Sequence, residues 1–76
     1  MEAKVITLET RRTGYSVDQV VDKTITVGEL RDYLENFDED DFVMFSNDNG
    51  YTFGELTDSM VTVYEFDEEE DRYIVE

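Results

Sequence analysis

The residues of this sequence that could carry chemistry are carboxylates, and many of them lie in two runs. The first run is Asp38–Asp41 and the second is Asp67–Asp71. Dense carboxylates can bind cations, supply an acid and a base to a reaction, or present negative charge to a basic partner. Histidine and cysteine are absent from the sequence, which removes the commonest general base, thiolate chemistry and disulfide bonds.

A calcium-binding loop is the first use of these acids to consider, and the nearest match is the segment around Gly50. If Gly50 takes the sixth position of an EF-hand loop, Phe45 falls at the first position and Leu56 at the twelfth. Both positions require oxygen ligands, so the motif fails. The acidic runs keep only the loose affinity for cations of any carboxylate cluster, and we expect no specific metal site and no cofactor.

Catalysis by a pair of carboxylates is the second use. Glycoside hydrolysis can run on two acids alone, but those acids need a concave and partly desolvated site. A chain of 76 residues rarely builds such a site, and among 21 acids a pair is not informative. We therefore predict that the protein is not an enzyme.

The net charge of −15 is unevenly distributed along the chain. Residues 1–31 contain five acids and five bases, whereas residues 32–76 contain sixteen acids and a single base, Arg72. This charge excludes ordinary binding of the C-terminal part to nucleic acids or anionic membranes, and it favours a cationic partner or simple solubility. No apolar run approaches the length that spans a membrane, so we predict a cytoplasmic protein.

The elements that must position the acids are clearest between Thr26 and Gly54. Thr26-Val27-Gly28-Glu29 is a capping box, and large apolar residues follow at helical spacing as far as Phe37. This pattern predicts a helix over about 27–37. Asp38–Asp41 then places negative charge at the C-terminal end of the helix, where the helix dipole favours cations. Local conflicts of this kind tend to occur at functional sites.

Short apolar or alternating segments predict the strands of a small sheet. The predicted strands are residues 4–10, 42–45, 51–53, 59–66 and 72–75. Asn49-Gly50 predicts a type I′ hairpin between the second and third strands. A weaker capping box, Ser16–Gln19, indicates a short helix at about 17–22, although three valines there disfavour it. We predict a single domain over residues 1–76 of the α+β class, with one main helix packed on a mostly antiparallel sheet of four to five strands.

The third use of the acids is imitation of a nucleic acid. Alternate carboxylates on a strand lie about 6.6–6.8 Å apart on one face, a spacing similar in scale to that of backbone phosphates. A rigid acidic surface could therefore occupy a basic groove and accept hydrogen bonds from its Arg and Lys side chains. The alternative is a solvated face that keeps a small protein soluble. The uneven charge and the placement of the runs at element ends favour imitation.

The acids that we predict to contact such a partner come from the two runs and the strand before the second. They are Asp38, Glu39, Asp40, Asp41, Glu65, Asp67, Glu68, Glu69, Glu70 and Asp71.

Residues 26–56 resemble small acidic proteins of bacteriophages and prophages. Those proteins have the form V-x-E-L-x-x-x-L, an acidic turn, a strand and D-x-G-Y, which Val27–Leu34 and Asp48–Tyr51 match. The resemblance covers about 31 of the 76 residues and mostly encodes a helix, a turn and a hairpin. Compact acidic phage proteins include anti-CRISPR inhibitors, several of which mimic DNA. The resemblance therefore implies a class of protein and transfers no site residues.

Charge and resemblance together predict a phage-type, anti-CRISPR-like inhibitor in the cytoplasm of a bacterial host. It would bind the basic nucleic-acid-binding groove of a host defence protein, for example a CRISPR effector, without binding nucleic acid itself. The alternative is a small accessory or structural phage protein with an ordinary protein partner, whose contacts would centre on exposed aromatics such as Tyr51 and Tyr64. Monomer and dimer both stay open, because edge strands of a small sheet can pair.

Overall fold

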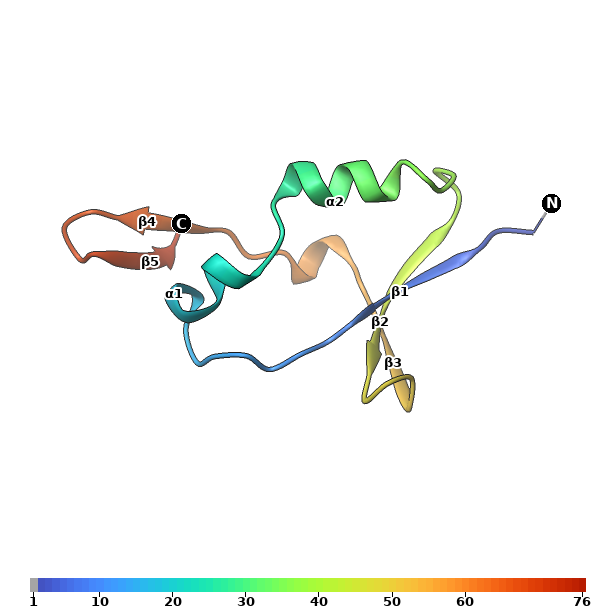
Figure 1. The fold of residues 1–76 in the computed structure, drawn as a ribbon, viewed down its shortest axis with the longest axis horizontal. Helices are drawn as coiled ribbons and strands as arrows, with labels where there is room; N and C mark the ends of the chain where they lie inside the picture. The colour runs from blue at the N-terminus through green and yellow to red at the C-terminus, as the bar shows by residue number, and fades with distance from the viewer. Residues whose placement is uncertain (1) are drawn as a thin grey trace. The chain divides into compact units, whose positions relative to one another are not determined.

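The computed structural model describes residues 2–76, and within them the chain forms two compact units (Figure 1). Unit 1 contains the residues up to Arg11 together with Ile25–Leu56, and unit 2 contains Arg12–Thr24 and Thr57–Glu76. The described residues form two short α-helices and five strands, so the predicted α+β class is confirmed. The predicted single sheet is wrong, because three strands form one sheet in unit 1 and two form another in unit 2. The single domain stays a prediction.

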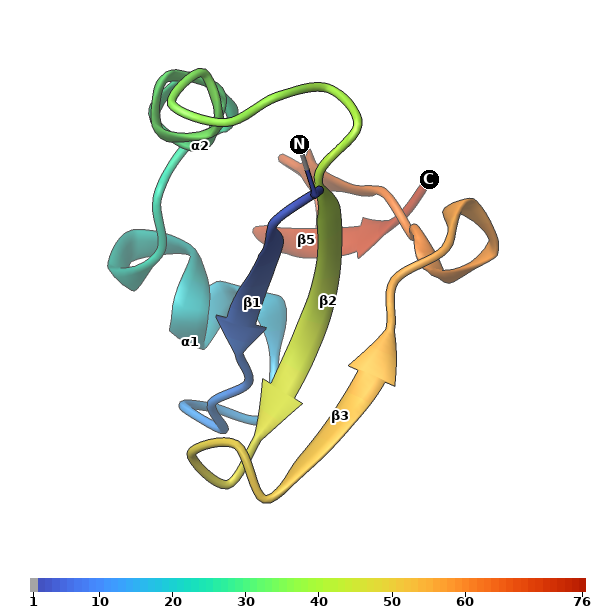
Figure 2. The same ribbon diagram turned by 90° about the vertical axis from the view of Figure 1, so that its right-hand side faces the viewer.

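The sheet of unit 1 has the strand order β1-β2-β3 (Figure 2). Its strands are β1 (Val5–Glu9), β2 (Phe42–Asn47) and β3 (Thr52–Glu55). β1 and β2 are parallel, with Val5 opposite Phe42, whereas β2 and β3 are antiparallel. Parallel strands cannot be joined by a tight turn, and here the connection contains both α-helices that the structure describes.

The predicted hairpin between β2 and β3 is present, but its turn has a different centre. Asp48 and Asn49 have φ values of 52° and 58°, and the N–H of Gly50 donates to the carbonyl of Asn47 at 3.2 Å. The central residues are therefore Asp48 and Asn49, two residue types that tolerate the left-handed region. Gly50 follows them at a φ of 92°, where a side chain would strain the backbone.

Helix α2 (Val27–Leu34) begins at the predicted capping box. The Thr26 hydroxyl accepts from the N–H of Glu29 at 3.2 Å, and the Glu29 carboxylate accepts from the N–H of Thr26 at 3.3 Å. The helix ends three residues before the predicted Phe37. Beyond Leu34 the chain makes shorter-range bonds, from the N–H of Phe37 to the carbonyl of Leu34 and from the Asn36 side chain to the carbonyl of Tyr33.

Replacing Thr26 with Ala is expected to lower the free energy of unfolding by about 0.5–2 kcal/mol, because the N–H of Glu29 loses its acceptor. Urea denaturation of the variant and the wild type measures the difference. The control is Thr13→Ala, at an exposed residue outside the helices and strands, which should change stability by no more than about 0.5 kcal/mol. Equal losses in both variants would mean that the capping box does not stabilise α2.

The predicted close packing of α2 on the sheet is not found. Among residues 2–76 no large apolar side chain is buried, and the buried residue is Ser46, at 4% exposure. Leu30, Leu34 and Phe37 are half-buried and line an open groove between α2 and the sheet. The physical reason is the shortness of α2, which ends at Leu34, so that Phe37 lies beyond the helix. Tyr33 is 57% exposed, which leaves only Leu30 and Leu34 of the predicted apolar face to pack.

Unit 2 begins with α1 (Val17–Val20), which continues as the 3-10 turn η1 (Val21–Lys23). The indicated helix at 17–22 is therefore present, with its second half in the tighter form. The side chain of Ser16 makes no cap hydrogen bond. The Gln19 side chain accepts from the N–H of Tyr15 at 2.7 Å and not from that of Ser16. The hydrogen bonds of the second predicted capping box are therefore wrong.

The second sheet is the hairpin of β4 (Tyr64–Asp67) and β5 (Arg72–Val75), which are antiparallel. The Asp18 carboxylate accepts from the N–H of Tyr73 at 3.2 and 3.3 Å and so ties α1 to β5. The predicted strand at 59–66 is wrong over residues 59–63, since Asp58–Met60 forms the 3-10 turn η2 and β4 begins only at Tyr64. A strand needs a partner, and β5 is long enough to pair only with Tyr64–Asp67.

Candidate functional site

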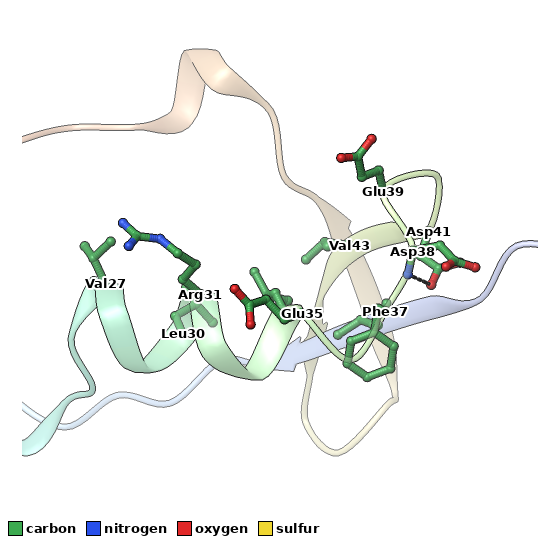
Figure 3. Close-up of a pocket in the computed structure, with 11 residues that line it drawn as sticks. Val27, Leu30, Arg31, Glu35, Phe37, Asp38, Glu39, Asp41 and Val43 are labelled. Carbon is green, nitrogen blue, oxygen red and sulfur yellow. Dashed lines mark hydrogen bonds between the residues drawn. The ribbon is translucent and has the colours of Figure 1, made fainter.

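The acidic corner, Asp38–Asp41, connects α2 to β2 and is held by one of its own carboxylates. Asp41 accepts from the N–H of Lys4 at 2.8 Å with Oδ1. It also accepts from the N–H of Asp38 at 2.9 Å with Oδ2, the bond that Figure 3 shows. Asp41 is half-buried, whereas Asp38, Glu39 and Asp40 are exposed. The corner therefore has one structural carboxylate and three that face solvent.

These hydrogen bonds set the ionisation of Asp41. The N–H groups of Lys4 and Asp38 stabilise the carboxylate and lower the pKa of Asp41 below its ordinary value of 3.8, against a smaller opposing effect of burial. Since the pKa is lower in the folded state than in the unfolded state, ionised Asp41 stabilises the fold above that ordinary value. The stabilisation is lost as the pH falls through the lowered pKa.

Replacing Asp41 with Asn is expected to destabilise the protein at neutral pH, because the amide nitrogen cannot accept one of the two N–H bonds. The difference from the wild type should shrink at pH values below the lowered pKa, where the wild-type carboxyl is also protonated. Urea denaturation at a series of pH values from about pH 6 downwards measures this change. Asp40→Asn, at the neighbouring exposed position, is the control and should not reproduce it.

The acidic loop, Asp67–Asp71, joins β4 to β5 and is organised in a similar way. The Asp67 carboxylate accepts from the N–H of Glu69 at 2.9 Å and from that of Glu70 at 3.3 Å, which closes a local turn. Asp71 has a φ of 54°, which aspartate tolerates better than most residues. Glu68, Glu69 and Glu70 are exposed at this loop.

The fold divides the ten predicted contact residues between the two units. The acidic corner belongs to unit 1, whereas Glu65, which is exposed on β4, and the acidic loop belong to unit 2. Unit 1 contains eleven acids and three bases, a net charge of −8, and unit 2 contains ten acids and three bases, a net charge of −7. The net charge differs strongly between the two parts of the sequence but is nearly equal in the two units, because the charge-balanced residues 1–31 are divided between both units.

This charge should make stability depend on salt. Because each unit carries a large net negative charge, its acids repel one another, and added ions screen that repulsion. The melting temperature is expected to rise between about 20 mM and about 500 mM sodium chloride. Potassium chloride should have the same effect, since screening depends on ionic strength. An unchanged melting temperature would contradict the expectation.

The main feature that the sequence did not reveal is the groove of unit 1, with a volume of about 620 Å³ (Figure 3). Its charged rim consists of Arg31, Glu35, Asp38, Glu39 and Asp41, and its apolar lining consists of Ile6, Val27, Leu30, Leu34, Phe37 and Val43. The helical spacing of the apolar residues was the available signal. It identifies the part of the lining that comes from α2, but not Ile6 and Val43, and it is the same for a closed core and an open groove.

The aromatic residues of the alternative hypothesis are also exposed. Tyr51, in the turn after β2, is 84% exposed, and Tyr64 on β4 is 44% exposed. Tyr15, before α1, is fully exposed and was not among the predicted contacts.

Within residues 2–76, acidic side chains do not gather in any group of three or more that could hold a metal ion. In the same part of the chain, no helix has the length and apolar character needed to cross a membrane. Comparison with protein-family models, curated proteins and solved structures finds no match.

Proposed function

We propose that this protein is a phage-type, anti-CRISPR-like inhibitor that acts in the bacterial cytoplasm by binding. Its acidic corner and acidic loop would occupy the basic nucleic-acid-binding groove of a host defence protein. The observation that carries the proposal is that some acids bond to the protein backbone while their neighbours are exposed to solvent. Asp41 and Asp67 hold the backbone, while Glu39, Asp40 and Glu68–Glu70 are exposed and can accept from a partner.

This arrangement suits recognition of a basic groove for two physical reasons. Internal hydrogen bonds already order both loops, so less conformational entropy is lost when the exposed acids bind. Carboxylates also form short, charge-assisted hydrogen bonds with Arg and Lys, the side chains that line phosphate-binding surfaces. The same charge repels nucleic acid itself, so the basic protein is the partner.

The test is capture of proteins from a bacterial host lysate at low and at high salt, followed by competition with labelled DNA or RNA for the captured protein. We expect one basic nucleic-acid-binding protein, displacement of its nucleic acid, and an affinity that falls steeply as ionic strength rises. A ternary complex of the partner, nucleic acid and this protein would contradict the proposal, because both ligands could not then share one groove.

The exposed tyrosines support a second candidate, a small accessory phage protein that binds an ordinary protein partner. Of the two tyrosines predicted as contacts, Tyr51 is the more exposed, at 84%, and lies at the turn between β2 and β3. An aromatic contact of this kind depends little on salt. Binding that persists at high salt and is lost in Tyr51→Ser would favour this candidate over mimicry.

A further inference from the structure

The groove of unit 1 exposes apolar side chains from three segments of the chain. Ile6 comes from β1, Val43 from β2, and Leu30 and Leu34 from α2. These four are half-buried, whereas Val27, at the start of α2, is 74% exposed. Apolar surface gathered in a concave site gains free energy when a ligand removes it from water, so the groove is suited to an apolar ligand surface.

The rim of the groove restricts the charge of that ligand. Glu35, Asp38, Glu39 and Asp41 lie on the rim with a single base, Arg31. An occupant that fits must be apolar where it enters the groove and positively charged where it meets the rim. Nucleic acids and acidic peptides lack this combination, and a second copy of the chain, with its net charge of −15, would be repelled.

We propose that the groove binds a basic amphipathic helical segment of another protein. Its apolar face would contact Leu30, Leu34 and Val43, and its Lys or Arg residues would face Glu35 and Glu39. An amphipathic helix in an apolar groove is a recurring mode of peptide recognition, in which the apolar anchors are spaced three and four residues apart. This site goes beyond the acidic mimicry proposed above, because it depends on apolar burial and lies in unit 1 alone.

The probe is an 18-residue peptide of Leu and Lys with leucines at helical spacing and one Leu replaced by Trp. Because the chain contains no Trp, the peptide fluorescence reports only the environment of that residue. We expect a blue shift on binding and a negative heat-capacity change in calorimetry, the mark of apolar burial. One control peptide has Glu in place of Lys, and a second has the same composition in scrambled order. Neither should bind comparably.

Matched variants locate the site. Glu35→Gln removes a charge from the rim, whereas Asp32→Asn removes one from α2 at a position outside the groove lining. Glu35→Gln should weaken binding several-fold and Asp32→Asn should not. Leu34→Ala should weaken it by about tenfold or more, and Leu56→Ala, in unit 1 but outside the groove, should not. Circular dichroism establishes that each variant is folded. If Leu34→Ala unfolds, the comparison of Glu35→Gln with Asp32→Asn decides whether the peptide binds in the groove.

The outcomes separate this site from the proposed function. Equal binding of the scrambled and helical peptides, or equal losses in Glu35→Gln and Asp32→Asn, would show attraction by charge alone and overturn the proposal. Absence of binding by the helical peptide would also overturn it. Reversing Glu68 and Glu69 in unit 2 should leave peptide binding unchanged while it impairs mimicry, so either proposal can fail without the other.

Discussion

Glu39→Lys combined with Asp40→Lys is expected to abolish binding to the basic partner while the protein stays folded. Glu68→Lys combined with Glu69→Lys should have the same effect. Like charges that face each other in a groove cost several kcal/mol, which is enough to reduce the affinity by orders of magnitude. All four side chains are exposed, so their replacement leaves the carboxylates of Asp41 and Asp67, which hold the two loops, in place.

The structure also selects the controls for these reversals. Glu9 is unsuitable although it lies in the charge-balanced N-terminal part, because its carboxylate accepts from the N–H of Asn49 at 3.0 Å. Glu2→Lys in unit 1 and Asp22→Lys in unit 2 change exposed acids outside both runs and should do little. The measurement is displacement of labelled nucleic acid from the partner. If both double variants still displace it, mimicry is wrong and the tyrosine-centred interface takes its place.

Gly50→Val is expected to lower the free energy of unfolding by about 1–3 kcal/mol, because Gly50 has a φ of 92° that a β-branched residue adopts only with strain. The cost is one of backbone conformation and not of space. A Cβ atom at Gly50 would meet only the tip of the Phe53 ring, at 3.9 Å. Urea denaturation measures the loss.

Gly54→Val is the matched control for this substitution. Gly54 lies in β3 opposite Phe45, where a Cβ atom would have an ordinary contact with Phe45 at 4.0 Å. Valine is favoured in strands, so this variant should be at least as stable as the wild type. Equal destabilisation by both valines would show that the loss comes from added bulk rather than from the positive φ.

Local signals in the sequence predicted local structure well. Thr26 and Glu29 identified the start of α2, because a capping box is completed within four residues of the chain. The loop around Asn47–Gly50 was identified as a hairpin, and only the choice of central residues was wrong. The end of α2 was missed because Asn36 takes the carbonyl of Tyr33, a competition that apolar spacing does not show.

Features that depend on distant residues were not predictable in the same way. The parallel pairing of β1 with β2 and the division into two sheets follow from which strands meet, and short segments carry no such information. Of the candidate site, the sequence identified which residues are acidic. It could not show that the Asp41 carboxylate accepts a hydrogen bond from the N–H of Lys4, a residue 37 positions earlier in the chain.

The parallel pairing of β1 with β2 also sets an order of events during folding. Met44 and Glu55 pair across the β2–β3 hairpin after closure of a short loop, and hairpins form in about 1–10 μs. Val5 and Phe42 are 37 positions apart, so pairing β1 requires closure of a longer loop at a higher entropic cost. When the complete chain refolds in solution, β1 is therefore expected to join its sheet last, after the β2–β3 hairpin has formed.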